Sequence, residues 1–566
     1  MPFAAPTAAL RLILDHVVPY GAIAGSGPFA EIGADVTDAV LDGAGQICTD
    51  VVAPSNRDGD IHPAVLENGV VRTAPSIGRA YRAIADGGWV AGSAPTAYGG
   101  LGLPLTLTTA VNDMMAGANM ALQTNPMLTQ GQIDALDRHA DDAIKAVYLP
   151  KLISGAWSGT MNLTEPQAGS DVGALTARAE AVGDGTYAVT GQKIYISWGD
   201  YDLVENISHL VLARLPGAPA GTKGISLFLV PKFIPDAAGN PGPRNAVRTV
   251  SLEHKLGTHG APTCVLSFEG ATGWLIGPEG GGMRAMFTMM NNARLTVGVQ
   301  GVGVAEAATQ AAVAFAADRR QGRSDTGTID GHADVRRMLA TMRAETFAAR
   351  AITMTCAAAF DLQAVTGDDS WGARGAFLTP IAKAFGTETG IDVAQMAIQV
   401  HGGMGYIEET GVAQFLRDVR VTSIYEGTNG IQAMDLVGRQ LSDRGEAAFA
   451  LLDAVETDAE AARNLRPDLA EPVWQAAETL RETCECLLDR AVPDRHAGAD
   501  PFLRAFARVL GGHAHLQAAL ARPDGAEARL ARFYILRLLP EHVGLCAAAV
   551  AAPDTVSEIL PGDLAL

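Results

Sequence analysis

The segment MNLTEPQAGSDVGAL, residues 161–175, marks the point where the character of this chain changes. Before it, apolar residues recur every three or four positions, as in LPLTLTTAVNDMMAGANMAL from Leu103, which predicts helices. After it come short β-rich runs such as TYAVTGQKIYIS and GISLFLVP, separated by glycine- and proline-rich turns, which predicts a small antiparallel β unit. The helical period returns from about residue 280. The expected class is therefore α+β and mostly helical.

These changes of pattern divide the chain into four parts. We expect an N-terminal helical domain over residues 1–158, a middle β domain over 159–278, a second helical domain over 279–440 and a helical extension over 441–566. The chain has 566 residues and is 48% hydrophobic. Because a single core stops growing at roughly 250–300 residues, this apolar content is enough for several packed domains.

Charge and composition exclude several classes of partner. The formal net charge of −20 argues against nucleic acid and against anionic membrane surfaces. The six cysteines are scattered without zinc-like spacing, so we expect free thiols in a reducing compartment and no bound metal. The N-terminus does not resemble a signal peptide, and no apolar stretch reaches the roughly 18 residues of a spanning helix. We expect a cytoplasmic protein without stable membrane insertion.

Three segments could form a ligand site. The turn at residues 161–175 offers many backbone N–H and hydroxyl donors to a planar heterocycle or a phosphate, although an ordinary turn has the same composition. GQKIYISWGD, residues 191–200, is a strand that ends in aromatics, either core residues or the wall of a cofactor site. QVHGGMGYIEETG, residues 399–411, is not preceded by a strand, which excludes a dinucleotide-binding fingerprint.

A fourth segment, RDVRVTSIYEGTNGIQ at residues 417–432, contains the candidate base. Glu426 lies in a short turn between apolar runs. An isolated glutamate is more often a solvated turn residue. Flanked by Ile424 and Tyr425, it could instead be partly desolvated, which would raise its pKa and make it a competent base.

Together, in this order and spacing, the four segments resemble the acyl-CoA dehydrogenase family over about residues 30–440. The resemblance implies a helical domain, a β domain and a four-helix bundle, with FAD bound non-covalently between them. It implies conversion of an acyl-CoA thioester to the 2,3-enoyl-CoA, with electron-transferring flavoprotein as acceptor. It also implies a homodimer or tetramer, because the QxxGGxG segment of one subunit holds the FAD of its neighbour.

The resemblance also assigns roles to individual residues. Glu426 matches the catalytic base, while the position used by a subset of the family is Ala293 here. The residues that match FAD contacts are Leu163, Thr164, Ser170, Tyr195, Ile196, Ser197, Arg319, Gln321, Gln399, Gly402, Gly403, Thr428 and Gly430. Those that match acyl-CoA contacts are Ser170, Asn291, Arg294 and Gly427. The chain departs from the family at Tyr195, usually Trp, at Gly430, often Gln, and at Gln321-Gly322, which alters an R-x-x-F-G pattern.

The length of the chain indicates a particular subfamily. The N-terminal segment and the extension after residue 440 are similar to a long bacterial subfamily. That subfamily includes enzymes for 3-methylmercaptopropionyl-CoA, formed in dimethylsulfoniopropionate breakdown, and for fatty acyl-CoA. Sulfur and CH₂ are nearly isosteric, so apolar contacts separate a thioether from a short or medium fatty acyl chain by only about 1–3 kcal/mol. The substrate stays open, as do an acyl-CoA oxidase that uses dioxygen and a non-catalytic binding protein.

Overall fold

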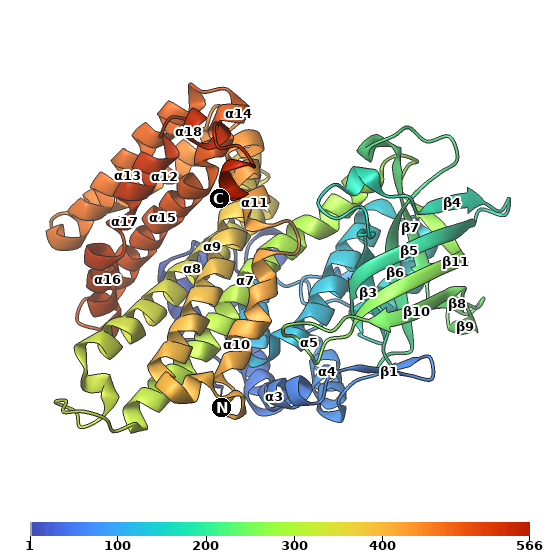
Figure 1. The fold of residues 1–566 in the computed structure, drawn as a ribbon, viewed down its shortest axis with the longest axis horizontal. Coiled ribbons are helices and arrows are strands. Elements are labelled where there is room, and N and C mark those ends of the chain that lie inside the picture. Colours follow the sequence, from blue (N-terminus) through green and yellow to red (C-terminus); the bar gives the residue numbers. More distant parts are fainter. Residues whose placement is uncertain (1–2, 566) are drawn as a thin grey trace.

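The computed structural model describes residues 3–565, apart from the side chains of Asn291 and Ala565. Figure 1 shows a twisted β sheet on one side, long helices through the middle and a second group of helices on the other side. The expected α+β class, mostly helical, is confirmed.

The N-terminal part is helical, as its periodicity predicts. Its α-helices are α1 (Thr7–His16), α2 (Ala34–Ile47), α3 (Ala53–Ile61), α4 (Pro75–Asp86), α5 (Leu105–His139) and α6 (Asp142–Ile153). A hairpin of β1 (Val65–Glu67) and β2 (Val70–Arg72) was not expected. Its turn is Asn68-Gly69 with φ of 52° and 77°, which is a recognisable hairpin signal, but strands of three residues are too short to show alternation.

The middle part is a seven-stranded sheet with the order β10-β11-β5-β4-β6-β3, in which β7 pairs with β11 and β6. The strands are β3 (Trp157–Asn162), β4 (Arg178–Ala181), β5 (Tyr187–Ser197), β6 (Asn206–Arg214), β7 (Ile225–Pro231), β10 (Val247–Leu252) and β11 (Thr263–Ile276). A separate pair is β8 (Phe233–Pro235) with β9 (Pro241–Arg244). The antiparallel expectation was wrong for β3, which pairs parallel with β6. The 43 residues between these strands provide the long crossover that parallel pairing needs.

The bundle consists of long helices that follow the sheet. They are α7 (Gly282–Asp318), α8 (Ala333–Thr366) and α9 (Asp369–His401), followed by the shorter α10 (Val412–Val419) and α11 (Asn429–Asp435). Helices α7 and α9 meet backbone to backbone, since a Cβ at Gly301 would lie 2.1 Å from the carbonyl oxygen of Gly386. Helix α7 begins beside the sheet and runs away from it (Figure 1).

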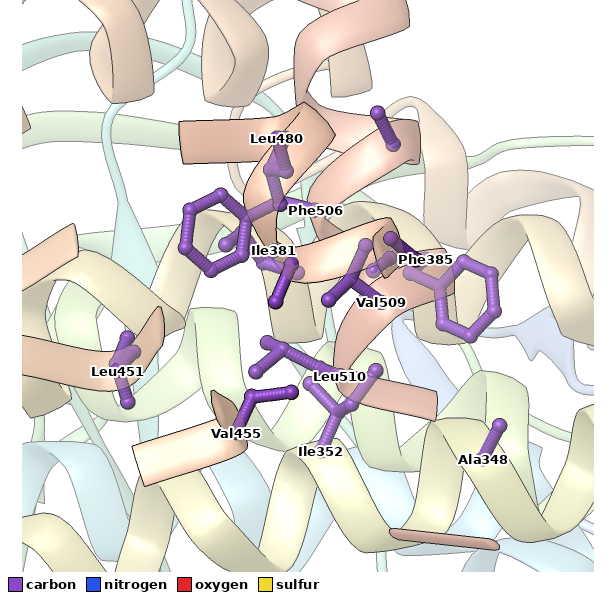
Figure 2. Close-up of a cluster of buried hydrophobic side chains, with 14 of the residues drawn as sticks. Ala348, Ile352, Ile381, Phe385, Leu451, Val455, Leu480, Phe506, Val509 and Leu510 are labelled. Atoms are coloured by element: carbon purple, nitrogen blue, oxygen red, sulfur yellow. The ribbon is translucent and has the colours of Figure 1, made fainter. Parts of the chain in front are cut away.

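The extension packs on the bundle and shares its core. Its helices are α12 (Glu446–Ala462), α13 (Pro467–Leu488), α14 (Val492–Arg495), α15 (Ala499–Ala521), α16 (Ala526–Arg537), α17 (Glu541–Ala549) and α18 (Asp554–Ser557). Figure 2 shows Phe506 and Leu510 of α15 beside Ile381 of α9 and Ile352 of α8, all within one buried cluster. Among residues 3–565, no helix is long and apolar enough to cross a membrane.

Candidate active site

The turn that carries Glu426 lies between a 3-10 turn, η10 (Arg420–Ser423), and α11. Glu426 and Gly427 are both left-handed, with φ of 56° and 86°. This conformation costs a non-glycine residue about 1–2 kcal/mol, and such strain concentrates at functional sites. The side-chain amide of Gln432 donates to the carbonyl oxygens of Glu426 and Gly427 at 3.4 and 3.3 Å. The hydroxyl of Thr428 accepts from the Ile431 amide at 3.3 Å and caps α11. The turn is thus held at both ends.

The electrostatic environment of Glu426 suits a proton acceptor. Burial raises the pKa of its carboxyl to about 7, although the positive charges of Arg294 and Lys383 act in the opposite direction. A group with a pKa near neutrality combines an available charged form with a strong tendency to take a proton. Arg294 is buried, and its Nη2 lies 3.8 Å from the position of a Cβ built on Gly427. Glu426 and Arg294 therefore belong to one site.

The loop at residues 161–175 is locked to the strand that carries the aromatic segment. Lys193 of β5 is fully buried, and its Nζ lies 2.8 Å from Glu165 Oε1 and 2.9 Å from the Leu163 carbonyl oxygen. Glu165 also accepts from Gln167, from the hydroxyl and amide of Thr176 and from the Ala177 amide, at 2.7–3.0 Å. Burial opposes the charged form, but these donors outweigh it and lower the pKa of Glu165 to about 2. The backbone at Leu163 is therefore fixed by a buried ion pair.

The candidate side chains on this loop and on strand β5 differ in whether they are exposed to a ligand. Tyr195 has φ of 60° and is 61% exposed, so its ring is available to a ligand. Ile196 is buried within the core of the sheet, so only its backbone can serve such a site. Ser197 and Thr164 are half-buried, and Ser170 is exposed. Leu163 and Tyr425, the residue before Glu426, both pack against one apolar cluster, so the loop and the Glu426 turn border the same core.

A second group of candidate residues lies at the other end of the bundle. The C-terminal ends of α7 and α9 meet where the Phe315 ring stacks on His401, with ring centroids 4.2 Å apart. Around this contact lie the exposed candidates Arg319, Gln321, Gln399, Gly402 and Gly403. Arg319 follows Arg294 by 25 residues along α7, which at a rise of 1.5 Å per residue is roughly 37 Å. The structure therefore divides the predicted site residues into two groups.

The remaining candidates join the first group. Gly430 stands in the first turn of α11, two residues after Thr428. Asn291 lies on α7, three residues before Arg294, and its side chain is outside the described part of the structure.

Sequence reasoning missed several residues that shape the site. Gln432 holds the Glu426 turn, Glu165 and Lys193 fix the adjacent loop, and Lys383 approaches from α9. Lys383 carried a visible signal, because it is a single lysine inside the apolar helical run TPIAKAF.

Comparison with known proteins identifies the class to which this arrangement of fold and site belongs. Profiles described as the acyl-CoA dehydrogenase N-terminal, middle and C-terminal domains match residues 38–156, 160–271 and 280–441. A fourth, acetyl-CoA dehydrogenase C-terminal like, matches residues 450–559. The chain belongs to the acyl-CoA dehydrogenase family, a family of oxidoreductases.

Particular relatives extend the match over nearly the whole chain. 3-Methylmercaptopropionyl-CoA dehydrogenase of Ruegeria pomeroyi is 42% identical over 549 residues, which covers 94% of this chain and 92% of the relative. The predicted resemblance to the long bacterial subfamily is confirmed. The fold is shared with Caenorhabditis elegans ACDH-11 in complex with C11-CoA, with a TM-score of 0.79, 20% identity and coverage of 94% and 91% of the two chains. It is also shared with a Bacillus anthracis acyl-CoA dehydrogenase complexed with FAD, with a TM-score of 0.73, 19% identity and coverage of 99% and 93%.

Proposed function

We propose that this protein is an FAD-dependent acyl-CoA dehydrogenase that introduces a 2,3-double bond into an acyl-CoA thioester, with Glu426 as base. The observation that carries the proposal is the half-buried carboxyl of Glu426 on a left-handed turn next to Arg294 and Lys383, where burial raises its pKa to about 7. Membership of the acyl-CoA dehydrogenase family supports dehydrogenation as the reaction for which this geometry is suited.

The residues of the first group fit a flat, hydrogen-bonding cofactor. Thr164, Ser170 and Ser197 supply hydroxyls, and the exposed ring of Tyr195 supplies a stacking surface. The buried Oδ1 of Asn162, next to Leu163, has no hydrogen-bond partner among the described residues and could accept one from a ligand. These residues would hold the isoalloxazine part of FAD, together with Leu163, Ile196, Thr428 and Gly430. When bound, FAD supplies the hydride acceptor for the reaction.

The chain's own residues handle the proton and the position of the substrate. Glu426 takes the proton from the α-carbon, and the strained turn aims its carboxylate before the substrate arrives. Arg294 is buried beside Gly427, where it can help to place the thioester end of the substrate. The same guanidinium favours the ionised form of Glu426, since its positive charge lowers the pKa of the base.

The second group supports the proposal of a symmetric oligomer. A residue roughly 37 Å from Arg294 along α7 is poorly placed to serve the active site that contains Arg294 and Glu426. We propose that Arg319, Gln321, Gln399, Gly402 and Gly403 hold the pyrophosphate and adenosine part of the FAD of a second subunit, in a homodimer or tetramer. An arginine suits this task because its planar guanidinium binds phosphate oxygens in pairs.

We also propose a substrate, an electron acceptor and a cellular location. The substrate would be 3-methylmercaptopropionyl-CoA or a short or medium fatty acyl-CoA, supported by the 42% identity to the Ruegeria enzyme. We propose electron-transferring flavoprotein as electron acceptor, a cytoplasmic location and a role in dimethylsulfoniopropionate breakdown or fatty acid metabolism.

An anaerobic visible spectrum, taken before and after adding acyl-CoA thioesters, tests the proposal. The panel contains 3-methylmercaptopropionyl-, butyryl-, octanoyl- and palmitoyl-CoA. We expect a yellow protein whose flavin band is bleached by at least one thioester, a Glu426→Gln variant that stays yellow, and a Glu482→Gln control that behaves as wild type. Glu482 is an exposed glutamate on α13. Rapid reoxidation by air would identify an oxidase, and failure to bind added FAD would favour a non-catalytic protein.

A further inference from the structure

Lys383 is a fully buried lysine within an otherwise apolar stretch of α9. Its neighbours Ile381, Ala382, Ala384 and Phe385 belong to the core shared with the extension. A buried ammonium is costly unless it is paired or hydrogen-bonded, so its presence requires a physical reason.

The direct hydrogen bond of Lys383 leads to the catalytic turn. Its Nζ donates to Asn429 Oδ1 at 2.9 Å, and Asn429 follows Glu426 by three residues. The Thr387 hydroxyl donates to the same oxygen at 3.2 Å, while Asn429 Nδ2 donates to Glu388 Oε1 at 3.2 Å. Both ends of the Asn429 amide are therefore bound to consecutive turns of α9.

The packing of α7 against α9 places Arg294 on the same side. A Cβ at Gly298 would lie 2.4 Å from the Ala382 carbonyl oxygen and 3.1 Å from Lys383 Cα, so the two helices touch at Lys383. Arg294 lies one helical turn before Gly298 and therefore on the same face of α7. Two cations, one from each helix, thus approach Glu426.

Charge explains why the ammonium is tolerated. Burial lowers the pKa of Lys383 to about 8, Glu426 and Glu388 act to raise it, and Arg294 acts to lower it. Glu388 in turn faces Asp500 and Arg504 of the extension. At neutral pH an ammonium held at Asn429 stabilises the charged form of Glu426.

We infer that Lys383 is a positioning residue for the base, because its buried ammonium holds Asn429, and with it the turn that carries Glu426, against α9. This inference rests on the proposed function. Its effect on ionisation follows from Coulomb attraction, since an opposite charge nearby favours the carboxylate. Removal of the ammonium should therefore both loosen the turn and make Glu426 harder to ionise.

Lys383→Met tests the inference, because methionine nearly matches the shape of lysine but has neither its charge nor its donor. The measurement is the pH profile of kcat/KM for the best thioester of the panel. We expect the acid limb to move upward by about one pH unit, so that activity falls about tenfold at pH 6 and much less at pH 9. Lys232→Met, which breaks an ion pair with Asp200 at 2.6 Å in the β domain, should leave the acid limb in place.

A second variant separates positioning from simple damage to the fold. Asn429→Leu removes the acceptor of Lys383 but leaves its ammonium, so it should lower kcat at all pH values and move the acid limb less than Lys383→Met does. An acid limb that stays at the wild-type pH in Lys383→Met overturns the inference.

Two further readouts separate this inference from the proposed function. FAD content and the exchange of the substrate α-proton with solvent deuterium should be measured for each variant. If wild type does not bleach its flavin with any thioester, the proposed function fails. If wild type bleaches and Lys383→Met exchanges the α-proton as fast as wild type at pH 6, the positioning role alone fails.

Discussion

Replacement of Lys193 by methionine should release the loop that would contact the cofactor. In the structure, Lys193 holds Glu165 at 2.8 Å and the Leu163 carbonyl oxygen at 2.9 Å, and both charged side chains are buried. Removing one partner of a buried pair typically costs about 3–5 kcal/mol, because the other charge is left without compensation. Four protein donors still serve Glu165, from Gln167, Thr176 and Ala177. We therefore expect the lower end, about 3 kcal/mol.

Hydrogen exchange measured by mass spectrometry reports this loss locally. Because each 1.4 kcal/mol is a factor of ten, about 3 kcal/mol corresponds to roughly hundredfold faster exchange in peptides that span residues 161–178. FAD affinity, followed by flavin fluorescence, should weaken in parallel. Replacing Glu165 by glutamine in the same protein should restore part of the protection, since the orphaned charge is then gone.

The control is Lys232→Met, which should leave exchange in residues 161–178 at the wild-type rate. Unchanged exchange in Lys193→Met would refute the reasoning, because the buried pair would then contribute nothing to the loop. Weaker FAD binding without faster exchange would equally contradict it, since Lys193 would then act on the cofactor and not on the loop.

Three further predictions concern the turn and the bundle. The kcat/KM of wild type should fall tenfold per pH unit below about pH 7, because burial raises the pKa of Glu426 to that value and only the charged form accepts a proton. A kcat/KM profile that is flat down to about pH 5 would contradict this. Gly427→Ala should lower kcat at least about tenfold with FAD still bound, because its φ is 86° and the new Cβ would lie 2.8 Å from Gln432 Nε2; steady-state kinetics and the flavin-to-protein ratio check it. Arg350→Met should lower the free energy of unfolding by about 3–5 kcal/mol, because the buried Asp113 would lose its partner at 2.6 Å. Urea unfolding followed by far-UV circular dichroism measures this loss, and a loss below about 1 kcal/mol would contradict the prediction.

The local pattern of apolar residues in the sequence was sufficient to predict the order of helices and strands. The three-to-four spacing of apolar residues indicated the long helices, such as α8 from Ala333, and alternation with turn residues indicated the sheet. The sequence was also enough to select Glu426, Arg294 and Gly427 as candidates, because each position of a family motif can be matched to one residue of this chain. Pairing was harder to predict, since a parallel β3–β6 pair joins strands 43 residues apart and leaves no local signal.

Tertiary structure alone decided which charges meet. Glu165 and Lys193 are 28 residues apart and Lys383 and Asn429 are 46 apart, yet each pair is joined by a hydrogen bond. Sequence pattern reports whether a residue faces a core, but a pKa depends on burial and on charges that approach from other elements. The sequence by itself determined that a glutamate stands in a turn between apolar runs of an α+β chain that resembles the acyl-CoA dehydrogenases. Only the packing of α7, α9 and α11 places Arg294 and Lys383 around it, because α7 and α9 approach closely at Gly298 and Gly301 and bring the two cations to the same turn.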